Sequence, residues 1–214
     1  MPLLASMLMM TAIVGVPFLA RGGDFHVTTE ADAPHWKPSL GSCETAPGDG
    51  RCTLRAAIMA ANAQPGPDRV VVPAGTYSLS AVGRVEDYSM IGDLDVTDDL
   101  VIEGAGADVT IIDGLGDDRV LDVHDARVAV SDLRIANGAT TQIPEPGGAI
   151  RSSGALTLVG VQLSDSWGPI AADCQTPSRC DATRSGGAIS STGSLSLQDV
   201  RVDGLRVGRE RAEP

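Results

Sequence analysis

Two closely similar stretches each contain "GGAI" two residues from their start: "EPGGAIRSSGALTLVGVQLSDS" (145–166) and "RSGGAISSTGSLSLQDVRVDGL" (184–205). Each copy continues with a turn, a short run that alternates apolar and small residues, a break, and a second such run. The second "GGAI" lies 39 residues after the first. The apolar positions keep that offset: Leu156 and Leu158 correspond to Leu195 and Leu197, and Val161 and Leu163 to Val200 and Val202.

A third copy of the two-run pattern, without "GGAI", is "ARVAVSDLRIANG" (126–138), which lies 28 residues before the next copy. A weaker copy is "DDLVIEGAGADVTIIDG" (98–114). Side chains of a strand alternate between two faces, so each apolar pair points one way. One such unit cannot bury its apolar face alone, whereas stacked units bury all but the ends. The repeats therefore predict a stack of coils in which equivalent positions pair in register. A β-sandwich also uses short alternating strands but predicts no such repeats.

Composition limits the classes of function. The 214 residues fit one domain, with 43% hydrophobic residues for a core and only 3% aromatic residues. The net charge is −12, and Lys37 is the one lysine. So acidic a chain argues against nucleic acid as a partner, because phosphate binding needs clustered Lys and Arg. It also argues against an anionic polysaccharide without bridging cations. We expect a monomer.

The N-terminal residues 1–23 predict a signal peptide or a membrane anchor, because Pro2 to Ala20 are uncharged and mostly apolar. A buried strand or helix is the alternative. Cleavage near Ala20 would release a protein that is secreted or held at the cell surface. An anchor would instead keep this segment in contact with a membrane.

Residues 24–69 predict a cap region with a helix at 53–62. Thr53 can act as its N-cap, and "PGP" ends it. Its apolar face comprises Leu54, Ala57, Ile58 and Ala61. Arg55 is expected to face water. The segment "VVVPAGTYSLS" (70–80) predicts strand, turn and strand, and we assign residues 70–214 to coils, leaving open that the coils are truncated at the C-terminus.

The four cysteines form two close pairs, Cys43 with Cys52 and Cys174 with Cys180. In an exported chain each pair would form a disulfide, stabilising the fold by roughly 2–3 kcal/mol. A zinc site is the alternative. Neither pair has the close spacing typical of zinc ligands, and no histidine lies near Cys174 or Cys180.

The ordered series "CTLRAAIMAAN", "VVVPAGTYSL", "GDLDVTDDLVIEGAGADVTIIDG", "LRIANG" and "GGAI" resembles the bacterial CSLREA-domain proteins over about residues 24 to 205. The resemblance implies a secreted, surface-associated right-handed parallel β-helix of the pectin-lyase-like superfamily. "GGAI" is also similar to repeats of polymorphic outer-membrane proteins. Ala56 stands where the family has its signature glutamate. Asn137 ends one coil, but Ser166 and Leu205 stand near that place in later copies, so no asparagine ladder is expected.

No catalytic residues are assigned. A galacturonan hydrolase of that superfamily would combine "NxD", "DD", "GHG" and "RxK", whereas the paired carboxylates here lack the other elements. His26, His35 and His124 are never flanked by two glycines. No cofactor is expected apart from calcium, for which the weak candidate ligands are Asp93, Asp95, Asp98 and Asp99 in "GDLDVTDD". The simpler interpretation of Asp98 and Asp99 is that they are solvated turn residues.

We therefore expect an exported, non-catalytic surface or adhesin-like protein that binds polysaccharide or a cell-surface protein. Outward residues of successive coils should align in rows, Thr157 with Ser196 and Gln162 with Arg201. The alternative is a polysaccharide lyase or glycoside hydrolase with an unrecognised site, near Asp98 and Asp99 or in the loop at 167–184.

Overall fold

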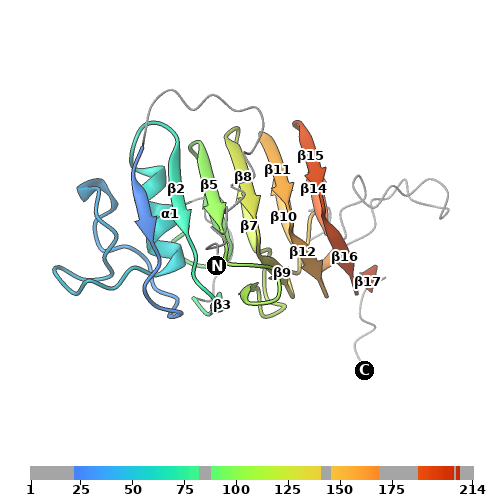
Figure 1. The fold of residues 1–214 in the computed structure, drawn as a ribbon, viewed down its shortest axis with the longest axis horizontal. Coiled ribbons are helices and arrows are strands. Elements are labelled where there is room, and N and C mark those ends of the chain that lie inside the picture. Colours follow the sequence, from blue (N-terminus) through green and yellow to red (C-terminus); the bar gives the residue numbers. More distant parts are fainter. Residues whose placement is uncertain (1–21, 82–87, 141–145, 169–187, 205, 208–214) are drawn as a thin grey trace, which may run out of the picture.

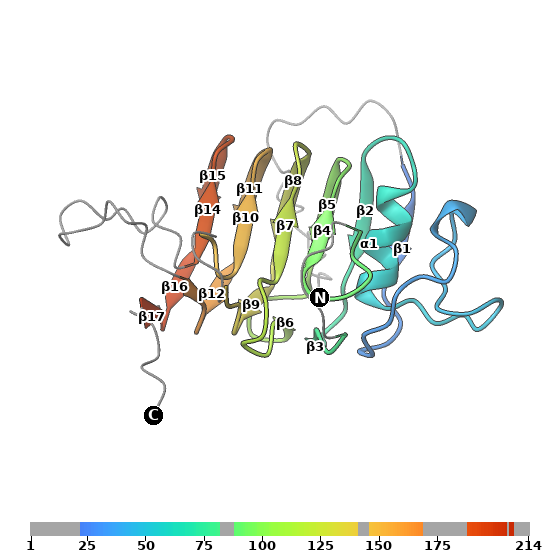
Figure 2. The same ribbon diagram turned by 180° about the vertical axis from the view of Figure 1, so that it is seen from behind.

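The computed structural model describes residues 22–81, 88–140, 146–168, 188–204 and 206–207. It is mostly β-structure, arranged as three parallel sheets with one α-helix at one end (Figures 1 and 2). The first sheet contains β1 (Asp24–His26), β2 (Asp68–Val71), β5 (Leu100–Glu103), β8 (Arg127–Ser131), β11 (Ala155–Val159) and β15 (Leu195–Gln198). The second contains β3 (Gly75–Ser78), β6 (Thr110–Asp113), β9 (Arg134–Ala136), β12 (Gln162–Ser164) and β16 (Arg201–Asp203). The third contains β4 (Leu94–Val96), β7 (Leu121–Val123), β10 (Ile150–Ser152) and β14 (Ile189–Ser191).

The chain visits the three sheets in rotation. From β2 onward each strand is followed by one in the next sheet, with one short addition, β13 (Trp167–Gly168), which pairs with β17 (Arg206–Val207). We call one passage through the three sheets a coil. The predicted strand–turn–strand at 70–80 is confirmed as β2 and β3.

The predicted register is confirmed. Leu156 and Leu158 of β11 pair with Leu195 and Leu197 of β15, and with Val128 and Val130 of β8. In the second sheet Leu163 pairs with Ile135 on one side and Val202 on the other. The offsets of 28 and 39 residues therefore both correspond to one coil. The apolar residues of these rows that lie in the inner coils make the core, with Leu158 and Leu163 both 0% exposed.

Equivalent turns between strands share a backbone conformation. After the first sheet the chain enters the left-handed region at Asp132, Gly160 and Asp199, with φ of 53°, 62° and 52°. After the second sheet it does so at Asn137, Asp165 and Gly204, with φ of 52°, 51° and 64°. Asn, Asp and Gly tolerate this region best. The equivalents of Asn137 in the later coils are thus Asp165 and Gly204, each one residue before Ser166 and Leu205, so no asparagine repeats at this turn.

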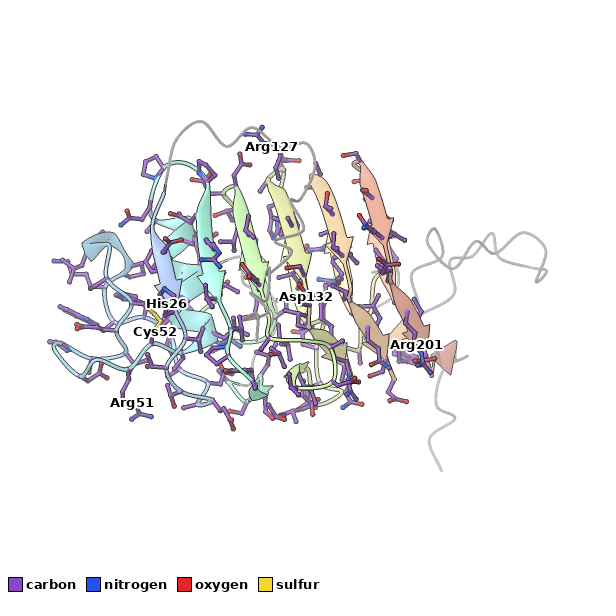
Figure 3. All side chains as sticks on the ribbon, viewed as in Figure 1. His26, Arg51, Cys52, Arg127, Asp132 and Arg201 are labelled. Atoms are coloured by element: carbon purple, nitrogen blue, oxygen red, sulfur yellow. A yellow bond between two sulfur atoms is a disulfide. The ribbon has the colours of Figure 1, made fainter. Side chains whose placement is uncertain are left out.

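The predicted helix at 53–62 is confirmed as α1 (Leu54–Asn62), with the Thr53 side chain accepting a hydrogen bond from Ala56 N at 3.0 Å. It lies at the end of the stack beside β2 (Figure 1) and contacts β1, β2 and β4. The Cys43–Cys52 disulfide, also confirmed, ties the preceding segment, which contains a 3-10 helix η1 (Pro38–Leu40), to the start of α1 (Figure 3). Cys174 and Cys180 lie outside the described residues, as do residues 1–21 of the expected signal segment.

Every helical residue from Leu54 to Ala61 is buried, so α1 is covered on all sides. The expectation that Arg55 faces water was wrong: Arg55 is 0% exposed. Its guanidinium binds the Asp32 carboxylate at 2.6 Å and 3.2 Å and donates to the backbone carbonyls of Ser89, Gly92 and Asp93. The residues before β4 provide these acceptors, which is why a charged side chain can be buried in the helix. Within the described ranges, no helix is long and apolar enough to span a membrane.

Candidate functional site

The outward positions of the third sheet gather the charged side chains of the candidate site. In β4, β7, β10 and β14 the aligned outward residues are Asp95, Asp122, Arg151 and Ser190. Neighbouring strands lie about 4.8 Å apart, so Asp95 and Asp122 are held side by side by the register itself. We call Asp93, Asp95, Arg119, Asp122, His124 and Arg151 the polar cluster.

Ion pairs connect the polar cluster through Asp122. Arg119 Nη1 lies 3.1 Å from Asp122 Oδ2 and 3.1 Å from Asp93 Oδ2. Arg151 binds the same Asp122 carboxylate, with Nε 2.9 Å from Oδ1. His124 Nε2 lies 3.1 Å from Asp95 Oδ1 and 3.6 Å from Asp122 Oδ2. Two arginines therefore face three carboxylates, and the His124 imidazole lies beside two of them.

Asp95 is fixed by a second set of contacts, with Ser89. The Ser89 N–H donates to Asp95 Oδ2 at 2.9 Å, its hydroxyl donates to the Asp95 carbonyl at 2.9 Å, and the Asp95 N–H is 2.6 Å from the same hydroxyl. Ser89 has a φ of 56°, a conformation unusual for serine. Arg55 binds the Ser89 carbonyl. The buried arginine of α1 therefore helps hold the segment that contacts the polar cluster.

Burial changes the protonation of two carboxyl groups. Burial, with the nearby Asp95 and Asp118 carboxylates, raises the pKa of Asp93 to about 7 against the opposing effect of Arg119. Burial also raises the pKa of Asp95 to about 6, although the hydrogen bonds from Ser89 and His124 act in the opposite direction. The cluster therefore takes up and releases protons close to neutral pH.

Three groups of the polar cluster could hold a metal ion. One ligand atom each from Asp95, Asp122 and His124 lies within 4.8 Å of the others. Two carboxylates and an imidazole suit a divalent transition metal better than calcium, which prefers oxygen ligands throughout. However, Arg119 and Arg151 already bind Asp122, and a cation would compete with both for that carboxylate. The donor set is adequate for a metal, but the surrounding charges do not favour one.

The four expected calcium ligands fall into two groups with different partners. Asp93 and Asp95 belong to the polar cluster, while Asp98 and Asp99 lie in the turn before β5. Asp98 Oδ2 accepts from Gly66 N at 3.2 Å, and Asp99 is ion-paired with Arg127, with Arg127 Nε 2.9 Å from Asp99 Oδ2 (Arg127 is labelled in Figure 3). Asp99 is thus paired in the turn, where Arg127 lowers its pKa against the effect of burial.

The two outward rows expected from the repeats are present. Thr157 pairs with Ser196 across β11 and β15, and Gln162 pairs with Arg201 across β12 and β16. The second row continues into β9 through Arg134, which is partly exposed. Arg134 Nε donates to the Ala107 carbonyl at 3.2 Å, and Gln162 Nε2 donates to Asp203 Oδ2 at 3.0 Å. Most of the loop at 167–184 lies outside the described residues.

Sequence reasoning missed the core of the polar cluster: Arg119, Asp122 and Arg151, with His124 noted only for its lack of flanking glycines. A signal was available, because "LDV" occurs at 94–96 and again at 121–123. Those triplets are β4 and β7, which pair residue for residue. Their shared aspartates are the two central carboxylates of the cluster.

The polar cluster is largely closed to a substrate. The side chains of Asp95 and Asp122 are only 1% and 4% exposed, whereas those of His124 and Arg151 are 32% and 34% exposed. A ligand approaching from outside would therefore meet an imidazole and a guanidinium first.

A scan of protein-family models found no match to this chain, and searches of curated proteins and of solved structures found none either.

Proposed function

We propose that this chain is an exported right-handed parallel β-helix that binds a polysaccharide along its outer rows and does not catalyse a reaction. The rotation of the strands through three parallel sheets supports a β-helix, and crossovers between parallel strands are almost always right-handed. The resemblance to CSLREA-domain proteins points the same way. The Cys43–Cys52 disulfide supports passage through an oxidising compartment.

The observation that carries the binding proposal is the row of Arg134, Gln162 and Arg201 on adjacent strands of the second sheet. The strands place a hydrogen-bonding side chain about every 4.8 Å along the stack. A polymer with repeated hydroxyl groups can bind several of these side chains at once. Each contact is weak, and the affinity comes from their number.

The contacts of the polar cluster argue against catalysis. A glycosidase needs two carboxyl groups on either side of the scissile bond. Asp95 and Asp122 are buried, and Asp122 is bound by two arginines. A sugar ring could reach neither without displacing Ser89 or the arginines.

The experiment is a glycan-array screen of the purified chain, followed by calorimetry on any ligand found. Arg134→Ala and Gln162→Ala should each weaken binding about 5- to 20-fold, since each removes one of several contacts. Arg51→Ala is the matched control: Arg51 is exposed and lies near the α1 end (Figure 3), so binding should not change. Binding that survives both row substitutions, or binding to a protein partner alone, would overturn the proposal.

A polysaccharide lyase or glycoside hydrolase is the second candidate, favoured by the meeting of Asp95, Asp122 and His124, where burial raises the pKa of Asp95 to about 6. Pectate, alginate, xylan and peptidoglycan fragments should be incubated with the chain, with and without calcium. New reducing ends and the absorbance of unsaturated products would report turnover. Turnover that is lost in Asp122→Asn and kept in Asp99→Asn would establish this candidate and remove the first.

A further inference from the structure

The last described coil exposes residues that elsewhere form the core. Leu197 of β15 and Val202 of β16 are each 43% exposed, whereas Leu158 and Leu163, their partners in the preceding coil, are 0% exposed. Among the described residues, no strand pairs with the outer edges of β14, β15 and β16. This end of the stack, β14–β15–β16, combines an apolar surface with unpaired strand edges (right end in Figure 1). We call it the open end.

The opposite end is covered. α1 contacts β1, β2 and β4, and its Ile58 is 0% exposed. The strands of an open end therefore cannot pair with strands at the α1 end of another molecule. If two copies associate through the open end, they meet open end to open end.

The charges of β16 fit this arrangement. Its sequence is Arg-Val-Asp, and in an antiparallel pair centred on Val202 each Arg201 lies opposite the partner's Asp203. Side-chain exposure is 74% for Arg201 and 39% for Asp203, so both are accessible (Arg201 is labelled in Figure 3). Within one chain Arg201 Nε lies 2.5 Å from Asp203 Oδ2, and in the pair each group gains a second partner of opposite charge. A parallel pair in register would instead place Arg201 opposite Arg201.

We propose that the open end is the interface of a two-fold symmetric dimer. The two-fold axis passes through the paired β16 strands, and the same operation sets β15 against the partner's β14. The interface covers the exposed Leu197 and Val202 and pairs strand edges that would otherwise be free to aggregate. It closes at two copies because the α1 ends point outward. This proposal replaces the expectation of a monomer.

The first experiment measures the mass of the full chain by sedimentation equilibrium up to about 100 μM, where a specific interface of this kind should be populated. We expect a dimer. Val202→Asp should raise the dissociation constant at least about 100-fold, because it buries two like charges at the centre of the interface. Val109→Asp is the control, since Val109 is 48% exposed and precedes β6 in the second coil, away from the open end. Both variants should melt at the same temperature as the original chain when diluted.

The second experiment tests the antiparallel pairing. Arg201→Asp and Asp203→Arg should each weaken self-association, since like charges then face each other. An equal mixture of the two variants should form a heterodimer, because each carries the complement of the other. Association through the apolar residues 2–20 would respond to neither substitution.

A monomeric chain at about 100 μM, a dimer that is insensitive to Val202→Asp, or a mixture that forms no heterodimer would each overturn the proposal. The result is separable from the proposed polysaccharide binding through Arg134→Ala, because Arg134 lies on β9, two strands inward from β16, and its replacement should leave the dimer intact.

Discussion

Arg55 illustrates how a single residue can connect the helix to the sheets. Its guanidinium joins Asp32 to three backbone carbonyls in the segment before β4. These groups are buried, so water cannot take the place of any of them as a hydrogen-bond partner. The side chain of Asp32 is 4% exposed and also accepts a hydrogen bond from Ala81 N at 2.8 Å. The arginine thus fixes two parts of the chain around α1.

Replacement of Arg55 by Ala should lower the free energy of unfolding by about 3–5 kcal/mol, because Asp32 would remain buried without its cation. Arg55→Lys should recover only part of this loss, since an ammonium group has three donors and no planar fork, whereas the guanidinium makes five hydrogen bonds here. Denaturant titration would measure both. Arg127→Ala is the control: the Arg127 side chain is 65% exposed, and its loss should cost less than about 1 kcal/mol. Equal losses for Arg55→Ala and Arg127→Ala would contradict the assigned role.

Asp68, at the start of β2, is 2% exposed, and its Oδ2 has no hydrogen-bond partner among the residues that the structure describes. Burial raises its pKa to about 6, and the Asp98 carboxylate adds to the shift despite the hydrogen bond from Gly23 N. The folded state thus holds this proton more tightly than the unfolded state. The resulting stabilisation is complete below about pH 4, where Asp68 is protonated in both states, and is lost as the pH rises through about 6.

Asp68→Asn should therefore raise the free energy of unfolding at about pH 8 by about 1–2 kcal/mol and change little at about pH 4. Urea titrations at both values would show the difference. Asp49→Asn provides the comparison, because the Thr45 hydroxyl lowers the pKa of Asp49, and no gain is expected there under the alkaline condition. A gain of equal size under both conditions would exclude ionisation as the cause.

At the scale of an element, the turns from the third sheet back to the first decide how closely coils stack. Ala126, Gly154 and Gly193 occupy equivalent places in successive coils. A Cβ atom on Gly154 would overlap the Ala126 backbone, and one on Gly193 would overlap the backbone at Ser153 and Gly154. The backbones of successive coils can come this close because Gly154 and Gly193 have no side chain and Ala126 has a small one.

Gly154→Val should consequently destabilise the fold by at least about 3 kcal/mol, since the backbone of two coils would have to separate. Ser194→Val, in the equivalent turn of the last coil, adds bulk where the side chain is exposed and should cost less than about 0.5 kcal/mol. Thermal unfolding of the two variants would test the comparison. If the two variants had the same melting temperature, the turns would not be tightly packed.

The elements were predictable where a pattern repeats. The matching apolar positions of "GALTLVGVQLSDS" and "GSLSLQDVRVDGL" are enough to predict the register of β11 with β15 and of β12 with β16. The burial of Arg55 was not predictable in this way, because helix periodicity assigns a charge to the water-facing side. Its acceptors are Asp32 and three carbonyls of residues 89–93, which no local pattern connects to the helix. The polar cluster was hidden similarly, since its members are brought together by strand pairing rather than by spacing along the chain.

At the scale of the whole molecule, the strands of each coil pair, within the described part of the chain, with strands of the adjacent coils, so stability should vary along the stack. In the Val202→Asp variant, where the open end remains uncovered, amide hydrogen exchange should be slowest in β5 and β8, which pair with a strand on each side. Exchange should be at least about 100-fold faster in β15 and β16, which have one neighbour each. Uniform protection across all coils would show instead that the stack opens as one unit.

The equivalence of Ala126, Gly154 and Gly193 also has a genetic consequence. Because each of these positions ends a coil in the same way, a duplication or deletion of residues 127–154 would rejoin the chain at matching turns and keep every strand in its sheet. The two observed spacings, 28 and 39 residues, show that additional residues between strands leave the pairing unchanged. Unequal recombination at these turns would therefore change the length of the product by whole coils and keep each remaining strand in its sheet.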